Sequence, residues 1–84
     1  MIFSADELRQ AVRGVWRNGK GVSVSGVFTD TRQDGKGKIF FALAGERFDA
    51  HDFLDRAVSA GAAALCVRRG APVPPGIPVL EELL

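Results

Sequence analysis

The chain has few of the residues that build metal and redox sites. It contains one cysteine, one histidine and no tyrosine among its 84 residues. A single cysteine excludes an intrachain disulfide framework, and the absence of a CxxC motif or a Cys/His cluster argues against a zinc site. Cys66 lies within the apolar run 63–67. This position predicts a small core residue rather than a nucleophile, and it fits a reducing compartment.

An excess of charge of one sign is also lacking. Lys and Arg number 11 against 10 Asp and Glu, which gives a net charge of +1. This balance is unlike the basic surface of a dedicated nucleic-acid binder. No apolar run approaches the roughly 20 residues that span a bilayer, and the N-terminal residues lack the basic start of a signal peptide. We therefore expect a cytoplasmic protein that has neither nucleic acid nor membrane as a partner.

The chain is short, and it lacks the common catalytic motifs. A length of 84 residues predicts one domain with a modest core and little room for an enclosed nucleotide cleft. There is no GxxxxGK[ST] phosphate loop, no GxGxxG and no GxSxG. We expect no catalytic residue and no metal site in this domain. The apolar pair that ends the chain suggests a cut within a longer sequence.

The N-terminal half predicts one helix followed by a strand. Ser4 and Glu7 form a capping box, which predicts a helix over 5–13 with Gly14 as its stop. Residues 15–16 are expected to open a strand, and 17–21 have the composition of a turn. Alternation of apolar and polar residues over 22–28 predicts a half-buried strand.

The C-terminal half predicts a βαβ unit. The apolar runs 39–43 and 62–67 are typical of strands that are covered on both faces. Between them we expect a helix from Asp49 or His51 to about residue 60, capped by Asp49 and followed by Gly61. Its apolar face would hold Phe53, Ala57 and Ala60, with Leu54 and Val58 beside them and with Asp55 and Arg56 pointing outward. Such a unit is right-handed with parallel strands. Residues 79–80, after a proline-rich tail, predict one last short strand.

The first polar loop has the chemistry of a ligand site. It reads Thr29, Asp30, Thr31, Arg32 and follows a predicted strand. In an extended stretch the two threonines face one side and Asp30 and Arg32 the other. Hydroxyls can hydrogen-bond a base or a sugar, and an Arg can hold a phosphate with two parallel bonds. The structural alternative is an Asp30–Arg32 ion pair beside threonines that favour the strand.

The second polar loop, 45–53, lies between a strand and a helix at the expected carboxyl edge of the sheet. Ligands of open α/β sheets bind at that edge, and helix N-termini favour anions. Arg47 adds charge and Phe48 a stacking face. The alternative places Phe48 in the core, Asp49 as a cap and His51 at the surface. From the residues alone we predict no more than a small-anion or nucleotide-sugar site.

Taken together, segments 29–32, 39–53 and 57–65 resemble the N-terminal domain of the Mur ligases, in order over about residues 3–80. The resemblance implies an α/β fold, a small mixed sheet with flanking helices, in a single UDP-MurNAc-peptide-binding domain over 1–84. It implies uridine contacts for Thr29 and Thr31 and lining of the same pocket by Glu46, Arg47 and Phe48. Asp30 and Arg32 belong to the same motif, with Arg32 a further substrate-binding candidate. Thr31 and the run 46–48 favour the member that adds D-alanyl-D-alanine to UDP-MurNAc-tripeptide over the member that adds the third stem residue.

The resemblance also implies a division of labour in peptidoglycan synthesis. In the family a central domain holds ATP and magnesium, and a C-terminal domain closes over the reaction. We expect both to be absent here, so that this domain has no cofactor and no ligase activity by itself. Its partners would be the substrate and the ATP-binding domain. One departure is 36–38, where the family carries Pro-Gly-Asp; this leaves the shape of that loop open. A non-catalytic interaction module of the same fold is the alternative.

Overall fold

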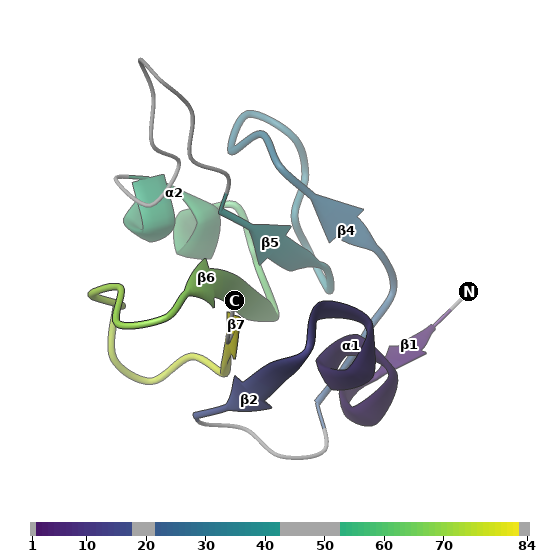
Figure 1. Ribbon diagram of the computed structural model, residues 1–84. Coiled ribbons are helices and arrows are strands. Elements are labelled where there is room, and N and C mark those ends of the chain that lie inside the picture. Colours follow the sequence, from purple (N-terminus) through teal and green to yellow (C-terminus); the bar gives the residue numbers. More distant parts are fainter. Residues whose placement is uncertain (1, 18–21, 43–52, 83–84) are drawn as a thin grey trace.

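A computed structural model describes residues 2–17, 22–42 and 53–82 (Figure 1). A mixed sheet of five strands in the order β2-β7-β6-β5-β4 forms its centre. β7, β6, β5 and β4 run parallel to one another, and the edge strand β2 is antiparallel to β7. This small mixed sheet with flanking helices confirms the predicted α/β fold class. The strands are β2 (Gly14–Trp16), β4 (Val27–Phe28), β5 (Ile39–Phe41), β6 (Ala64–Arg68) and β7 (Val79–Glu82).

Helix α1 (Ala5–Val12) begins at the predicted capping box. The Ser4 hydroxyl accepts from the Glu7 amide at 3.2 Å, and the Glu7 carboxylate accepts from the Ser4 amide at 3.1 Å. The predicted stop at Gly14 is wrong, because the helix ends on Arg13 in the left-handed region with φ 51°. Gly14 begins β2 instead. A Cβ there would lie 2.7 Å from the Glu81 carbonyl oxygen, so glycine permits close approach to β7.

The single strand predicted over 22–28 is two strands in two different sheets. β3 (Ser23–Val24) pairs antiparallel with β1 (Phe3–Ser4), and β4 pairs parallel with β5. Between them the Ser25 amide donates to the Gly37 carbonyl at 2.9 Å, where the chain passes from one sheet to the other. The predicted turn at 17–21 lies largely outside the described residues.

The βαβ unit is confirmed. β5, α2 (Leu54–Ser59) and β6 follow one another, and the two strands pair in parallel. Leu54 and Ala57 are buried as expected, but Val58 is exposed. Gly61 follows the helix with φ 101°, as predicted. The predicted helix start at 49–51 lies outside the described residues. None of the described helices is long and apolar enough to cross a membrane.

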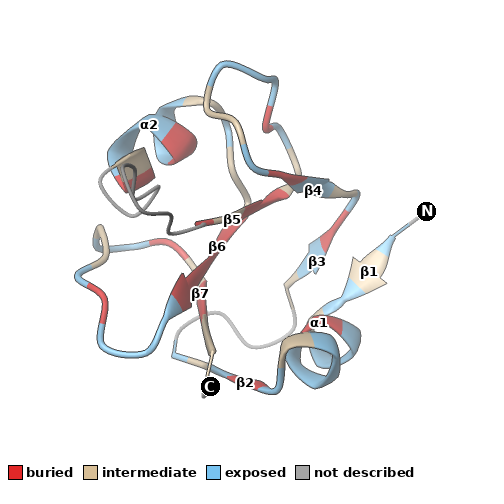
Figure 2. Ribbon diagram, turned by 45° about the horizontal axis from the view of Figure 1, so that its top comes forward, coloured by how far each residue is buried: buried red, intermediate tan, exposed pale blue. Residues whose placement is uncertain are grey.

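Side chains alternate across the sheet and build a core on each face. Figure 2 shows buried residues along the central strands, with α1 and α2 on either side. Phe40, Leu65, Val67 and Val79 pack on the α2 side with Leu54 and Ala57. Ile39, Ala64, Cys66 and Leu80 pack on the α1 side with Leu8. Cys66 is almost completely buried, which confirms the predicted core residue. This burial raises the pKa of its thiol to about 12, so little reactive thiolate is present at neutral pH.

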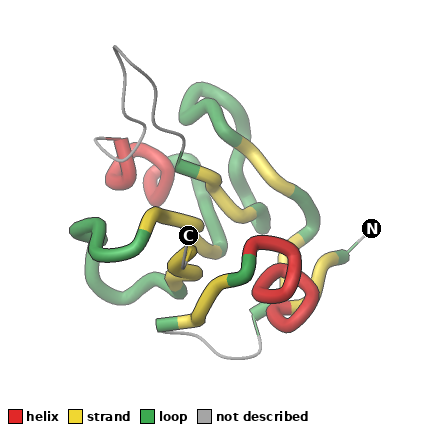
Figure 3. The backbone as a smooth tube through the Cα atoms, in the orientation of Figure 1, coloured by secondary structure: helices red, strands yellow, loops and turns green. Residues whose placement is uncertain are grey.

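β7 is longer and more central than the short last strand that we predicted. It runs over four residues and lies between β6 and β2. Figure 3 shows the long loop that connects β6 to β7. Ala71 and Ile77 of this loop are buried in the α2-side core, so the proline-rich segment packs against the sheet before the chain re-enters it.

Candidate functional site

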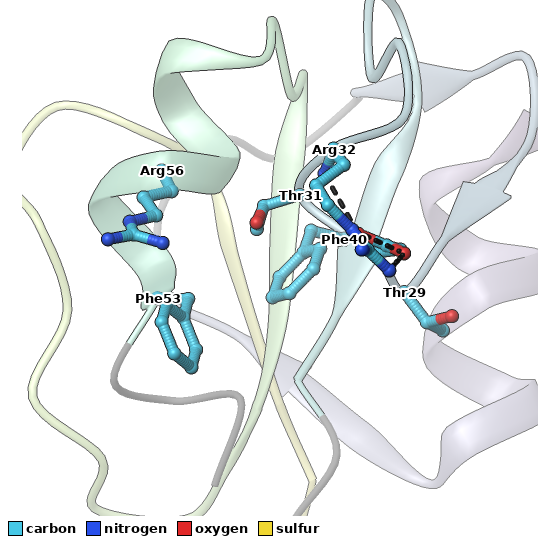
Figure 4. Close-up of a pocket in the computed structure, with 7 residues that line it drawn as sticks. Thr29, Thr31, Arg32, Phe40, Phe53 and Arg56 are labelled. Carbon is cyan, nitrogen blue, oxygen red and sulfur yellow. Dashed lines mark hydrogen bonds and ion pairs between the residues drawn. The ribbon is translucent and has the colours of Figure 1, made fainter. Parts of the chain in front are cut away.

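An open pocket of about 470 Å³ lies at the carboxyl edge of the parallel strands, where ligands of open α/β sheets bind. Its walls come from the segment after β4, from β5 and from the start of α2 (Figure 4). The structure thus brings the first polar loop to the expected edge. The lining residues are Thr29, Asp30, Thr31, Arg32, Phe40, Phe53 and Arg56.

The predicted polar loop at 29–32 forms a turn, so the two-sided arrangement of side chains that an extended stretch would give does not apply. The Asp30 carboxylate accepts from the Arg32 backbone amide at 2.9 Å, and the Gln33 amide donates to the Asp30 carbonyl at 3.0 Å. The turn forms because the short Asp side chain can bond to the backbone two residues further on. Asp30 and Arg32 therefore curl toward each other while both threonines still line the pocket.

Asp30 and Arg32 form the ion pair that was the structural alternative. The Arg32 Nη2 lies 2.7 Å from Asp30 Oδ2, and Arg32 Nε donates to Asp30 Oδ1 at 3.0 Å. These hydrogen bonds lower the pKa of Asp30 to about 2 and raise the pKa of Arg32. At neutral pH the pair is fully ionised and its two charges largely offset each other.

Aromatic rings form the apolar wall of the pocket. Phe40 is almost completely buried and meets Phe28 edge-to-face, with ring centroids 5.1 Å apart. Phe53 was expected on the core-facing side of the helix; it is half-buried and also lines the pocket. In Figure 4, Phe53 and Arg56 lie across the opening from Thr31 and Phe40. A flat ligand group would meet ring surfaces in this pocket.

Phe40, Phe53 and Arg56 line the pocket but were not among the predicted site residues, and Arg56 is the one that carries a charge. Its guanidinium carbon lies 5.1 Å from the centroid of the Phe53 ring, a cation–π contact. We expected Arg56 to point outward, and it is exposed. At this end of α2, however, the outward side is the rim of the pocket. The available signal was the three-residue spacing of Phe53 and Arg56, which places them on one face of the helix next to the loop.

Three of the predicted site residues, Glu46, Arg47 and Phe48, lie outside the described residues, as does His51. Thr29, Thr31 and Arg32 are all in the pocket. In the described parts of the chain, no group of three or more His, Cys, Asp or Glu side chains is arranged to hold a metal ion. The described pocket offers hydroxyl groups, ring surfaces and a cation, which together suit a polar ligand with a flat ring and a negative charge.

No family model matches the chain. It is 44% identical over 67 residues to UDP-N-acetylmuramoyl-tripeptide--D-alanyl-D-alanine ligase of Haemophilus influenzae, covering 80% of this chain and 15% of the ligase. The Escherichia coli ligase of the same name is 53% identical over 51 residues, covering 61% of this chain and 11% of the ligase. The chain thus spans less than a sixth of the length of these curated relatives.

The fold is similar to that of a solved structure. UDP-N-acetylmuramoylalanyl-D-glutamyl-2,6-diaminopimelate--D-alanyl-D-alanyl ligase from Acinetobacter baumannii matches with a TM-score of 0.85 and 32% identity. The match covers 99% of this chain and 19% of that ligase. Nearly the whole chain therefore corresponds to one small part of a much larger enzyme.

Proposed function

Because this chain is a homologue of the D-alanyl-D-alanine-adding Mur ligases and has the fold of their N-terminal domain, we propose that it binds UDP-MurNAc-tripeptide for such a ligase. The observation that carries the proposal is the pocket itself. Residues 29–32, which belong to the motif shared with these ligases, lie at the carboxyl edge of the parallel strands. The rings of Phe40 and Phe53 and the guanidinium of Arg56 lie beside them. The process served is peptidoglycan synthesis in the cytoplasm.

In this proposal the chain binds and orients the substrate. The hydroxyls of Thr29 and Thr31 hydrogen-bond the uridine, Phe40 offers an apolar wall, and the turn held by Arg32 keeps the hydroxyls in place. Glu46, Arg47 and Phe48 complete the pocket. In the full ligase the carboxylate of the bound peptide would first be activated as an acyl phosphate. The amine of D-alanyl-D-alanine would then attack the acyl carbon, which would form the amide bond and release phosphate.

Activation of that carboxylate requires chemistry from outside these residues. ATP supplies the energy for the amide bond, and magnesium offsets the charge of its phosphates. The described residues include no set of side chains suited to magnesium, and the sequence has no phosphate loop. We therefore propose that a neighbouring ATP-binding domain is the partner of this one, and that these 84 residues alone have no ligase activity.

Of the alternatives, the ligase that adds the third stem residue has weaker support. Relatives named as 2,6-diaminopimelate ligases match at 35–40% identity, compared with 42–53% for those named as D-alanyl-D-alanine ligases. An interaction module would present an apolar docking patch. The structure describes four large exposed apolar residues: Ile2, Val15, Val27 and Val58. They come from four different segments of the chain, so no single segment supplies such a patch.

Titration of the ¹⁵N-labelled chain with UDP-MurNAc-tripeptide tests the proposal. We expect amide shifts at Thr29 and Thr31, and we expect Thr31→Val to weaken binding about 5-fold, the typical effect of one lost hydrogen bond. Ser23→Ala removes an exposed hydroxyl from β3, outside the pocket, and should leave binding unchanged. An absence of shifts at Thr29, Thr31 and Arg47 would contradict the site.

A further inference from the structure

Among the described residues, two guanidinium groups line the pocket, those of Arg32 and Arg56, and their surroundings differ. We propose that Arg56, held against Phe53, is the residue that receives the diphosphate of a nucleotide ligand, and that Arg32 instead shapes the loop. This inference rests on the proposed function, because it assumes that the pocket takes a nucleotide. It assigns the phosphate-binding role to a helix residue that lies outside the 29–32 motif.

Arg32 is engaged within its own loop. Its Nε and Nη2 atoms both donate to the Asp30 carboxylate, at 3.0 and 2.7 Å. A phosphate that approached Arg32 would also approach this carboxylate, and like charges at short range repel. The Asp30 carboxylate is ionised at neutral pH, and Arg32 lowers its pKa further, to about 2. Arg32 is thus a poor anion receptor while the pair remains intact.

Among the described residues, Arg56 has no such carboxylate partner. Three ion pairs join side chains in the described residues, and Arg56 belongs to none of them. Its contact is the Phe53 ring at 5.1 Å. A ring face attracts the cation without occupying its N–H donors, which stay available for a ligand. The forked donors of a guanidinium match two phosphate oxygens at once.

The placement of Arg56 fits a ligand that crosses the opening. Thr31 and Phe40 lie on one side of the pocket, and Arg56 and Phe53 on the other (Figure 4). A nucleoside bound at the threonines would therefore direct its phosphates toward α2. Contact with Phe53 restrains the long Arg56 side chain before the ligand arrives, which lowers the entropic cost of binding.

The test compares uridine, UDP and inorganic pyrophosphate on the 84-residue chain, with NMR detection of the Thr31 amide and the Arg56 Nε–H. We expect UDP to bind more tightly than uridine. Arg56→Gln should weaken UDP binding about 10-fold, the effect of a lost charge-assisted contact, and leave uridine binding unchanged. It should also abolish any shift that pyrophosphate causes at the Thr31 amide. Arg9→Gln, an exposed change on α1, should alter none of these values.

Arg32→Gln separates the two roles. We expect it to weaken uridine and UDP by the same factor, because it loosens the loop that both ligands contact. A preference for UDP that survives Arg56→Gln but is lost in Arg32→Gln would overturn the inference. Equal binding of uridine and UDP to the unaltered chain would also overturn it, while leaving the nucleoside site intact. If neither nucleotide binds but pyrophosphate still shifts Arg56 Nε–H, the nucleotide function fails and the anion-binding role of Arg56 stands.

Discussion

The two helices pack on opposite faces of the sheet, and they are held in place in different ways (Figure 2). α1 is stabilised by local contacts: the capping box at Ser4, and Asp6 bonded to Arg9 and Gln10. It buries only Leu8 completely. α2 has six residues, no side-chain cap and two buried residues, so its stability comes from burial against the sheet.

This difference has a functional meaning. At the start of α2, the N-cap position is occupied by Phe53, whose side chain makes no capping hydrogen bond. Its ring lines the pocket and contacts Arg56. α1 uses its first-turn side chains to stabilise itself, whereas at the start of α2 Phe53 and Arg56 line the pocket. The following changes test this contrast, beginning with the largest expected effect.

Leu54→Ala should remove most of what holds α2. Leu54 is buried in the core between the helix and the sheet. We expect a loss of about 3 kcal/mol in the free energy of unfolding, measured by urea denaturation. Asp55→Ala, on the exposed side of the same helix, should stay within about 0.5 kcal/mol. A loss below about 1 kcal/mol for Leu54→Ala would show that burial is not what holds α2.

Gly14→Ala tests the junction that follows α1. The added Cβ would lie 2.7 Å from the Glu81 carbonyl oxygen and 2.9 Å from Leu80 Cδ1, so β2 and β7 must separate. We expect a loss of about 2 kcal/mol in the free energy of unfolding. Gly26→Ala is the matched control, since its nearest neighbour, the Lys38 side chain, is 3.8 Å away. Equal stability of the two variants would mean that the β2–β7 approach tolerates a side chain.

Ser4→Ala should destabilise the protein by about 1 kcal/mol, because the N-cap hydroxyl no longer accepts from the Glu7 amide. Urea denaturation gives the free energy, and circular dichroism reports any loss of helix. Ser59→Ala, at the end of α2, removes no capping hydrogen bond and should change the free energy of unfolding little. If Ser59→Ala lowers the free energy of unfolding as much as Ser4→Ala does, then α1 does not depend on local capping more than α2 does, and the contrast between the two helices is wrong.

The smallest effect concerns the Asp30–Arg32 pair. The pKa of Asp30 in the folded chain is about 2, below its ordinary value of 3.8. The folded state therefore binds its proton more weakly than the unfolded state, and the pair adds stability above about pH 4 that is lost as the pH falls toward 2. In an NMR titration of the carboxyl carbon, Arg32→Gln should return the pKa toward 3.8. An unchanged pKa would mean that Arg32 is not its cause, and Arg9→Gln should leave it unchanged.

The sequence predicted what is determined locally. The capping box of α1 follows from two residues three apart, and the buried strands of the βαβ unit follow from continuous apolar runs. The same local rule failed over 22–28. There the alternation is continuous, but the partners belong to two sheets, so the break at 25–26 depends on residues far away in the chain.

The pocket was predicted only in part, because some of its features are determined locally and others depend on distant residues. The motif at 29–32 could be located from its residue types, and the carboxyl edge of the sheet from the βαβ pattern. The turn that joins Asp30 to Arg32 depends on a side-chain bond that a strand pattern does not reveal. The spacing of Arg56 from Phe53 places the two on one face of α2 but does not show that this face borders a pocket. Only the direction in which α2 leaves the sheet places it at the rim of the pocket.

The position of β7 bears on the order in which the chain folds during synthesis. β2 lies near the N-terminus, yet its sheet partner is β7, with Gly14 opposite Glu82 and Trp16 opposite Leu80. A ribosome therefore releases β2 long before the strand that pairs with it. Until β7 emerges, β2 lacks its partner in the sheet. Closure of the sheet is a late, long-range step, the kind that slows folding and leaves strand edges exposed while it is pending.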